Sequence, residues 1–171
     1  YTLMGGPASR STRLERLEGY ANALLDGYVF HPAEVFIVMS QSGRNIGPVE
    51  AALYAKEKEL QVVGITSVSQ SKVQTSRHPS GKKLYEIADI VIDTHVPSGD
   101  AAVEIAEGQP KVAPISTIIG SSILQGIVAE VAGAIHETGE VPPVWMSSNV
   151  DDGDDHNAKM AKKYQSRILP F

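Results

Sequence analysis

VFIVMSQSGRN, the segment from Val35 to Asn45, changes character halfway along its length. Its first half, Val35–Met39, is a continuous run of large apolar residues rich in β-branched side chains, which is typical of a strand covered on both faces. Its second half, Ser40–Asn45, is polar and contains Gly43, so the strand is expected to end at Met39 and a loop to follow. The segment therefore predicts a buried strand that delivers two serines, two amides and an arginine to one edge of a sheet.

Two further apolar runs of the same kind follow, at Gln61–Thr66 and Asp89–Asp93. Between the first two runs, residues 48–59 have apolar side chains at helical spacing, and Pro48 suits a first helical turn because its missing N–H is not needed there. Strand, helix and strand in this order form a β-α-β unit with parallel strands. We therefore expect an α/β fold, a three-layer α/β/α sandwich with a parallel sheet in the middle.

A helix is also expected before this unit. Residues 12–27 carry an apolar stripe at helical spacing. Thr12 and Glu15 form a potential capping box at its start, and Gly27 provides a stop.

Further elements are expected after the sheet. Residues 116–139 are apolar almost all round, which predicts a helix buried inside the domain or in a subunit contact. Residues 142–149 are expected to form a short strand, and residues 154–171 a terminal helix.

The composition narrows the class of partner. Fifteen basic against twenty acidic residues give a formal net charge of −5, which argues against a nucleic-acid binder, whose surface is basic. The chain has no cysteine, which suits a reducing compartment, so a cytoplasmic location is expected. Because no segment approaches about 18 uninterrupted apolar residues, no membrane span is expected. We expect one globular domain over residues 1–171 with a small-molecule partner.

Familiar cofactor and metal motifs do not fit the sequence. The stretch SGKK at Ser80–Lys83 lacks the preceding glycine and the following hydroxyl residue of a Walker-type loop. No G-x-G-x-x-G follows any of the apolar runs, so the dinucleotide fingerprint is absent. Asp154, Asp155 and His156 fit the acidic start of a helix better than a metal site. We therefore expect no cofactor and no bound metal.

The serine loop has the chemistry of an anion site. In a parallel sheet, the loops that leave the carboxyl ends of the strands share one edge, where ligands bind. Residues 40–45 and 66–71 would be neighbours there, and their hydroxyl and backbone N–H groups at helix starts suit a phosphate. The alternative is that these residues only turn the chain and cap the helices. Two such loops on successive strands favour the ligand site.

SQSGRN after a buried strand, followed one β-α-β unit later by GITS, resembles the sugar isomerase (SIS) domain, whose members bind phosphosugars. The stretches SRHPSGKKL, VPSGDA, STIIG and SSNVDDGDDHN are similar to an uncharacterised bacterial branch described only as sugar isomerase domain proteins. The resemblance implies the SIS (flavodoxin-like) topology and a homodimer, since related domains build their sites between subunits. By position it implies that the phosphosugar is bound by Ser40, Gln41, Ser42 and Asn45, with Ser67 as a further contact.

The sequence departs from the family pattern in two places. SIS domains usually begin with a strand and a Gly-x-Gly-x-Ser loop that has no counterpart here, so a single SIS-type domain without this first strand and loop is expected. In the amino-sugar isomerising branch an acidic residue precedes the Ser-Thr pair that opens the long helix, and Lys111 occupies that place here. The remaining candidates for catalytic proton transfer are Glu50 and His78. Their alternative roles are an acid that complements a helix dipole and a solvated loop histidine.

Aldose–ketose isomerisation of a sugar phosphate is the activity that the resemblance implies. Two alternatives stay open: a non-catalytic phosphosugar-sensing regulatory module, and an amino-sugar phosphate lyase or etherase.

Overall fold

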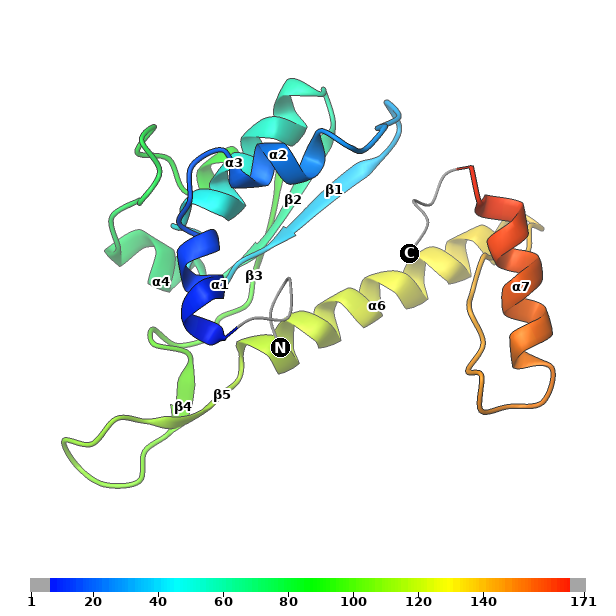
Figure 1. Ribbon diagram of the computed structural model, residues 1–171. Helices are drawn as coiled ribbons and strands as arrows, with labels where there is room; N and C mark the ends of the chain where they lie inside the picture. The colour runs from blue at the N-terminus through cyan, green and yellow to red at the C-terminus, as the bar shows by residue number, and fades with distance from the viewer. Residues whose placement is uncertain (1–6, 167–171) are drawn as a thin grey trace. The chain divides into compact units, whose positions relative to one another are not determined.

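The computed structural model describes residues 7–166 and divides the chain between Ser121 and Ser122 into two compact units. The first unit contains a three-stranded parallel sheet in the order β1-β2-β3, formed by Val35–Met39, Gln61–Thr66 and Ile90–Asp93 (Figure 1). Each strand agrees with a predicted apolar run to within one residue. The predicted α/β fold with a parallel sheet is confirmed, and the extent of the SIS-type domain stays a prediction.

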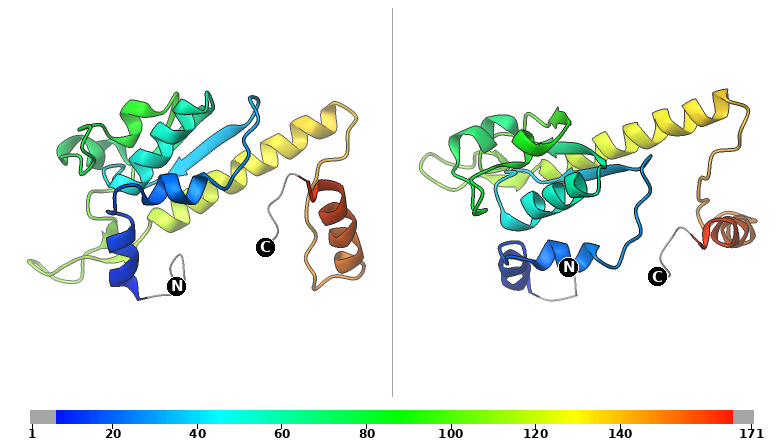
Figure 2. Two further views of the ribbon diagram at one scale, coloured as in Figure 1. Left: turned by 45° about the horizontal axis from the view of Figure 1, so that its top comes forward. Right: turned by 90° about the horizontal axis from the view of Figure 1, so that it is seen from above.

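Helices cover one face of this sheet. The helix α3 (Ile46–Glu57) joins β1 to β2 and packs on both strands, with α2 (Tyr20–Leu25) beside it (Figure 2). The short helix α5 (Leu84–Ile87) packs on β2. The buried core between these elements consists of Val38, Ala52, Ala55, Leu60, Val62 and Leu84. Burial of these apolar side chains is the main force that holds the three strand ends at one edge.

The opposite face of the sheet is more open. Val35, Ile37 and Met39 of β1 are 51%, 40% and 45% exposed. Gly120 of α6 (Ser116–Glu137) lies so close to Met39 that a Cβ at this position would overlap the methionine sulfur. The first turns of α6 therefore cover the carboxyl end of β1.

The predicted helix over residues 12–27 is wrong in its boundaries. The chain forms two helices instead, α1 (Ala8–Leu14) and α2 (Tyr20–Leu25). Thr12 is not an N-cap, because its hydroxyl donates to the carbonyl of Ala8 at 3.2 Å inside α1. The capping box therefore does not form.

Contacts with α3 explain the break between α1 and α2. Gly19 has a φ of 77°, and its N–H donates to Oε1 of Glu50 at 2.6 Å. The carbonyl of Glu15 accepts the N–H of Gly47 at 2.9 Å. Both contacts join residues far apart in the sequence, which is why local helical spacing does not reveal the break.

The predicted helix over residues 116–139 is confirmed as α6. Its apolar side chains stay exposed on their own unit, with Val128 at 58% and Val131 at 52%. Within the described residues, α6 is the one helix long and apolar enough to cross a membrane by length and composition. A single helix of this kind is weak evidence for a membrane span, because core helices of soluble proteins meet the same criterion. Burial of α6 in a subunit contact stays a prediction.

The remaining elements are short or lie near the C-terminus. The helix α4 (Val68–Val73) follows β2, and an antiparallel hairpin of β4 (Ala101–Val103) and β5 (Val112–Pro114) precedes α6. The strand predicted at residues 142–149 is wrong, since this stretch forms no regular element. The terminal helix is confirmed as α7 (Gly153–Tyr164), and the last five residues of its predicted range lie outside the described chain.

Candidate functional site

The segments that follow the three strands meet at one edge of the sheet. The carbonyl of Gln41, after β1, accepts the N–H of Ser67 at 3.0 Å and the hydroxyl of Thr66 at 3.2 Å. The side chain of Gln41 accepts the hydroxyl of Thr94, after β3, at 3.3 Å and donates to Oε1 of Gln70 at 2.9 Å. The two hydroxyl-rich loops are therefore neighbours, and Gln41 joins them.

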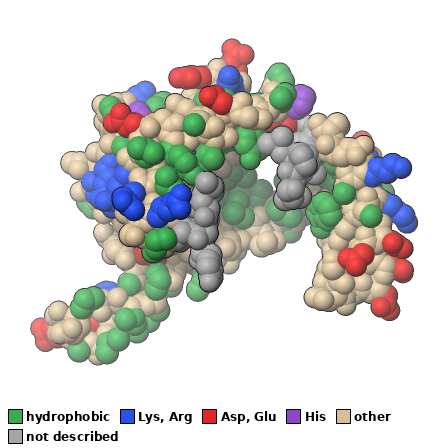
Figure 3. Space-filling model, viewed as in Figure 1, with side chains coloured by type: hydrophobic (Ala, Val, Ile, Leu, Met, Phe, Trp, Pro, Cys, Tyr) green, Lys and Arg blue, Asp and Glu red, His purple; other side chains and the backbone are tan. Residues whose placement is uncertain are grey.

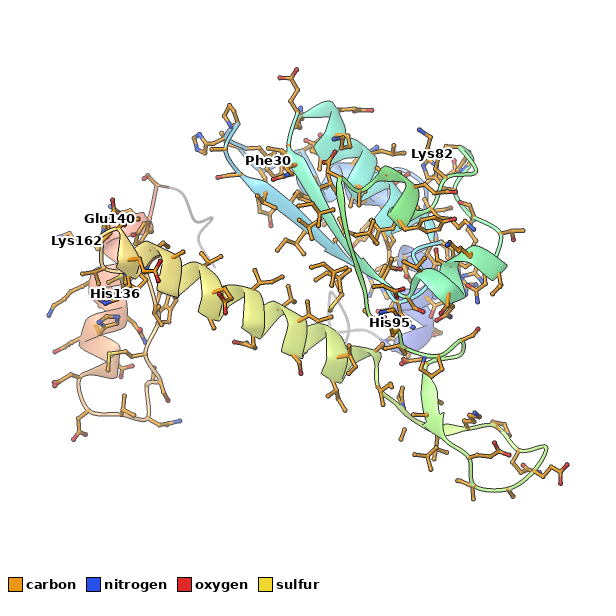
Figure 4. The ribbon with its side chains drawn as sticks, turned by 180° about the vertical axis from the view of Figure 1, so that it is seen from behind. Phe30, Lys82, His95, His136, Glu140 and Lys162 are labelled. Atoms are coloured by element: carbon orange, nitrogen blue, oxygen red, sulfur yellow. The ribbon has the colours of Figure 1, made fainter. Side chains whose placement is uncertain are left out.

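A cavity of about 260 Å³ lies at this edge. It is lined by Glu15, Met39, Ser40, Gln41, Pro48, Ile65, Thr94, Ser116, Thr117 and Gly120. Figure 4 shows the two ends of the sheet, with His95 beyond the carboxyl end of β3 and Phe30 at the start of β1. Four hydroxyl residues and one amide line the cavity beside apolar side chains. This mixture suits a small polar ligand that also has C–H surface, such as a sugar.

Two of the five residues predicted to bind a phosphosugar line this cavity, Ser40 and Gln41. Ser40 is 9% exposed, and its N–H donates to the carbonyl of Ile65 at 3.0 Å. This bond extends the ladder between β1 and β2 by one residue. It holds the Ser40 side chain at the carboxyl end of the sheet, where a ligand of such a fold binds.

The other three predicted residues do not line the cavity. Ser42 is half-buried, and Asn45 is buried, with its Oδ1 accepting a hydrogen bond from the guanidinium of Arg77. Ser67 is fully buried, and its hydroxyl donates to the carbonyl of Val96 at 2.8 Å. The same hydroxyl caps α4 by accepting the N–H of Gln70 at 3.4 Å. Ligand contact by these three residues stays a prediction.

Comparisons with known proteins show which sequences the chain is similar to. Residues 1–67 match the family model described as SIS domain, a segment that contains the serine loop after β1. The resemblance to the SIS domain family is confirmed. The chain is also 44% identical over 161 residues to a UPF0309 protein of Halalkalibacterium halodurans, an alignment that covers 94% of the chain and 64% of that protein.

Two further relatives are also UPF0309 proteins. A UPF0309 protein of Geobacillus kaustophilus is 43% identical over 161 residues, with 94% of the chain and 64% of that protein covered. A UPF0309 protein of Streptomyces coelicolor is 37% identical over 163 residues, with 95% of the chain and 65% of that protein covered. The chain thus spans slightly less than two thirds of the length of these relatives. The SIS domain match covers residues 1–67, and the printed names of the relatives state no ligand.

Glu50, one of the two predicted catalytic residues of the SIS domain, has a structural contact. It is 7% exposed, lies on α3 and accepts the N–H of Gly19 through Oε1. Its Oε2 is buried without a partner among the described residues. Glu50 does not line the cavity, and its catalytic role stays a prediction.

His78, the other predicted catalytic residue, lies in the loop between α4 and α5. Its Nδ1 lies 2.8 Å from the hydroxyl of Ser80 and accepts the N–H of Ser80 at 3.1 Å. His78 is also absent from the cavity lining. Lys82 of the same loop lies well away from His95 and the carboxyl end of β3 (Figure 4). The catalytic role of His78 stays a prediction.

Sequence reasoning missed several residues of the cavity, of which Ser116 is the most instructive. The carboxylate of Asp100 accepts the N–H of Ser116 at 2.7 Å, the hydroxyl of Ser116 at 2.6 Å and the N–H of Ile115 at 3.0 Å. Asp100 thus fixes the start of α6 beside the cavity. Lys111, which takes the place of the family's acidic residue, lies in the hairpin, 4.0 Å from Oε2 of Glu104.

Asp93, at the end of β3, holds the same edge together. Its Oδ1 accepts the N–H groups of Val68 at 3.1 Å and His95 at 3.0 Å. Burial by itself raises the pKa of Asp93, but the N–H groups of His95 and Val68 outweigh this effect and lower the pKa. Asp93 therefore ties the segment after β3 to the start of α4.

Among the residues that line the cavity, Glu15 alone is acidic. It follows α1, and its carbonyl is held against Gly47 at the start of α3. The described residues contain no cluster of three histidine, aspartate or glutamate side chains placed to hold a metal ion. Glu15 is exposed, and it is the one candidate for acid–base chemistry among the residues of this lining.

Proposed function

We propose that this chain binds a phosphorylated sugar in the cavity at the carboxyl edge of its sheet and isomerises it between the aldose and the ketose form. The observation that carries the proposal is the convergence of Ser40, Gln41, Thr94, Ser116 and Thr117 on one cavity of a chain that matches the SIS domain. Hydroxyl and amide donors at the end of parallel strands are suited to a phosphoryl group and to sugar hydroxyls.

Glu15 is the proposed base for this isomerisation. An aldose becomes a ketose when a base removes the proton from C2 and returns it to C1 of the enediol, while a proton moves between the two oxygens. Glu15 lines the cavity, whereas Glu50 and His78 have hydrogen-bond partners within the protein and lie outside the lining. The replacement Glu15→Gln is therefore expected to abolish exchange of the C2 hydrogen and to retain sugar phosphate binding.

Solvent exchange followed by NMR tests the activity. The protein is incubated in deuterated water with hexose and heptose phosphates, and deuterium at C2 supports the isomerase. Tight binding without exchange contradicts the isomerase and supports the second candidate, a phosphosugar sensor without turnover. One observation favours that candidate: Oε1 of Glu50 and Nδ1 of His78, which belong to the two residues predicted to be catalytic, each accept a hydrogen bond within the protein.

Calorimetry tests the binding site itself. Ser40→Ala is expected to weaken sugar phosphate binding by on the order of 1–3 kcal/mol, because a hydroxyl contact to the charged group is lost. Ser69→Ala is the matched control, since Ser69 lies exposed on α4 outside the cavity. Equal affinity of the Ser40→Ala variant and the unchanged protein would show that the ligand does not occupy this cavity.

A homodimer is the proposed assembly. The support is the exposed apolar surface of α6, where Val128 and Val131 are 58% and 52% exposed on their own unit. Sedimentation velocity at micromolar concentration is expected to give a dimer, and a single species with the mass of one chain would contradict the assembly.

A further inference from the structure

Three arginines gather around the N-terminal end of α3. Arg16 lies between α1 and α2, Arg44 lies in the serine loop after β1, and Arg77 lies in the loop between α4 and α5. The three belong to segments far apart in the sequence. Figure 3 shows lysine and arginine side chains gathered on the surface over α1 and beside α4.

Neutral partners hold Arg44 and Arg77 in place. The N–H of Arg77 donates to the carbonyl of Arg44 at 2.8 Å, which joins the two loops. The guanidinium of Arg77 donates to Oδ1 of Asn45, and Nη2 of Arg44 lies 3.4 Å from the hydroxyl of Thr75. Nε of Arg44 is buried without a partner among the described residues. The cluster therefore has more hydrogen-bond donors than the neighbouring residues provide acceptors.

The positive charge of the cluster is not compensated by close ion pairs. The salt bridges of residues 7–166 join other residues, although the chain contains more acidic than basic side chains. Burial lowers the pKa of Arg77, and repulsion by Arg44 and Arg16 lowers it further. The carboxylate of Glu15 acts in the opposite direction and raises the pKa. Three like charges held together in an acidic protein are stabilised when an anion binds among them.

The cluster and the cavity both adjoin the first turn of α3. Asn45, the N-cap of α3, contacts Arg77, whereas Pro48, in the first turn of α3, lines the cavity. One turn of an α-helix rises about 5 Å, which is similar to the distance between substituents at opposite ends of a small sugar. Glu15 lines the cavity and precedes Arg16 in the chain. The arginines thus lie next to lining residues in the chain, Arg16 beside Glu15 and Arg44 within four residues of Pro48.

We propose that Arg16, Arg44 and Arg77 bind a second acidic group of the ligand, so that the protein selects sugars with a phosphoryl group and a further carboxylate or phosphoryl group. Arginine suits this task because its planar guanidinium donates two parallel hydrogen bonds to either kind of group. The inference rests on the proposed binding of a sugar phosphate in the neighbouring cavity.

Calorimetry with three probes tests the inference. Glucose 6-phosphate carries one acidic group, 6-phosphogluconate adds a carboxylate, and fructose 1,6-bisphosphate adds a phosphoryl group. The unchanged protein is expected to bind at least one of the doubly acidic probes about 10- to 100-fold more tightly than glucose 6-phosphate, the factor for charge-assisted hydrogen bonds. The better of these two probes identifies the second group. The preference is expected to decrease at high salt concentration.

Arg16→Gln is the decisive variant, because no hydrogen bond of the Arg16 side chain is found within residues 7–166 and its removal leaves the described fold contacts intact. It is expected to remove the preference for the doubly acidic probe and to leave the affinity for glucose 6-phosphate unchanged within about twofold. Arg77→Gln is expected to do the same, with its folding checked by circular dichroism. Lys82→Gln, which removes one charge from the same loop, is the matched control and should retain the preference.

The outcomes separate the inference from the proposed function. Equal binding of all three probes by the unchanged protein overturns the inference and leaves the proposed function standing. Loss of glucose 6-phosphate binding in Arg16→Gln also overturns it, since the arginines would then hold the first phosphoryl group. If neither the unchanged protein nor Ser40→Ala binds any of the probes, the proposed function has failed, and the inference has failed with it.

Discussion

Gly43 provides the sharpest test of how the serine loop is built. The residue has a φ of 58°, and a Cβ placed there would lie 2.9 Å from Oγ1 of Thr66, 3.2 Å from Cβ of Leu84 and 3.3 Å from Oγ of Ser71. Thr66 cannot easily move away, because it is fully buried and its hydroxyl donates to the carbonyl of Gln41. Gly43→Ala therefore introduces both a left-handed alanine, at about 1–2 kcal/mol, and an overpacked contact, at about 1–3 kcal/mol.

Gly81→Ala is the control that separates these two effects. Gly81 has a similar φ of 71°, but a Cβ there meets nothing within 4 Å. Both variants gain the same small stabilisation from a less flexible unfolded chain, about 0.4–1 kcal/mol, so this gain cancels between them. The free energy of unfolding of Gly43→Ala is expected to fall below that of Gly81→Ala by about 1–3 kcal/mol, the packing contribution alone.

Urea unfolding followed by far-UV circular dichroism measures this difference. Trp145, the single tryptophan, lies in the second unit. The urea midpoint followed by its fluorescence is expected to change little in either variant. A difference between the two variants below about 0.5 kcal/mol would refute the reasoning, because Gly43 would then be required only for its backbone conformation.

Two further predictions concern carboxylates that hold the first unit together. Asp100→Ala removes the acceptor for Ser116 and Ile115 at the start of α6, so it is expected to lower stability by about 1–2 kcal/mol and to weaken sugar phosphate binding in calorimetry, while equal affinity would show that Ser116 does not contact the ligand. Asp89 accepts hydrogen bonds from Nζ of Lys56 at 2.6 Å and from the N–H of Val62 at 2.8 Å, and these, Lys56 first, lower its pKa. Because the pKa is lower in the folded state, the stabilisation is complete above the unfolded pKa of about 4 and is lost as the pH falls through the folded pKa. Thermal unfolding between pH 7 and pH 3 should therefore show a steeper loss of stability in the unchanged protein than in Asp89→Asn, and parallel curves would contradict this role.

The pattern of apolar residues in the sequence was enough to predict the three strands of the sheet. Continuous runs rich in β-branched residues placed all three strands to within one residue, although one face of β1, with Val35, Ile37 and Met39, is half-exposed. Helical spacing and Pro48 located α3, and the apolar character of residues 116–139 located α6. The polar loop after β1 was assigned to the ligand edge because every strand of a parallel sheet ends at the same side.

The tertiary structure decided which polar groups are free for a ligand. Ser67 has the hydroxyl that a ligand site needs, yet this hydroxyl donates to the carbonyl of Val96 and caps α4. Ser116 is far from the serine loop in the sequence, and Asp100 holds it at the cavity. The sequence states which donors exist, but each hydroxyl can point to a ligand or to the backbone. Contacts between distant segments make that choice, because a buried polar group must find a partner wherever the packed chain offers one.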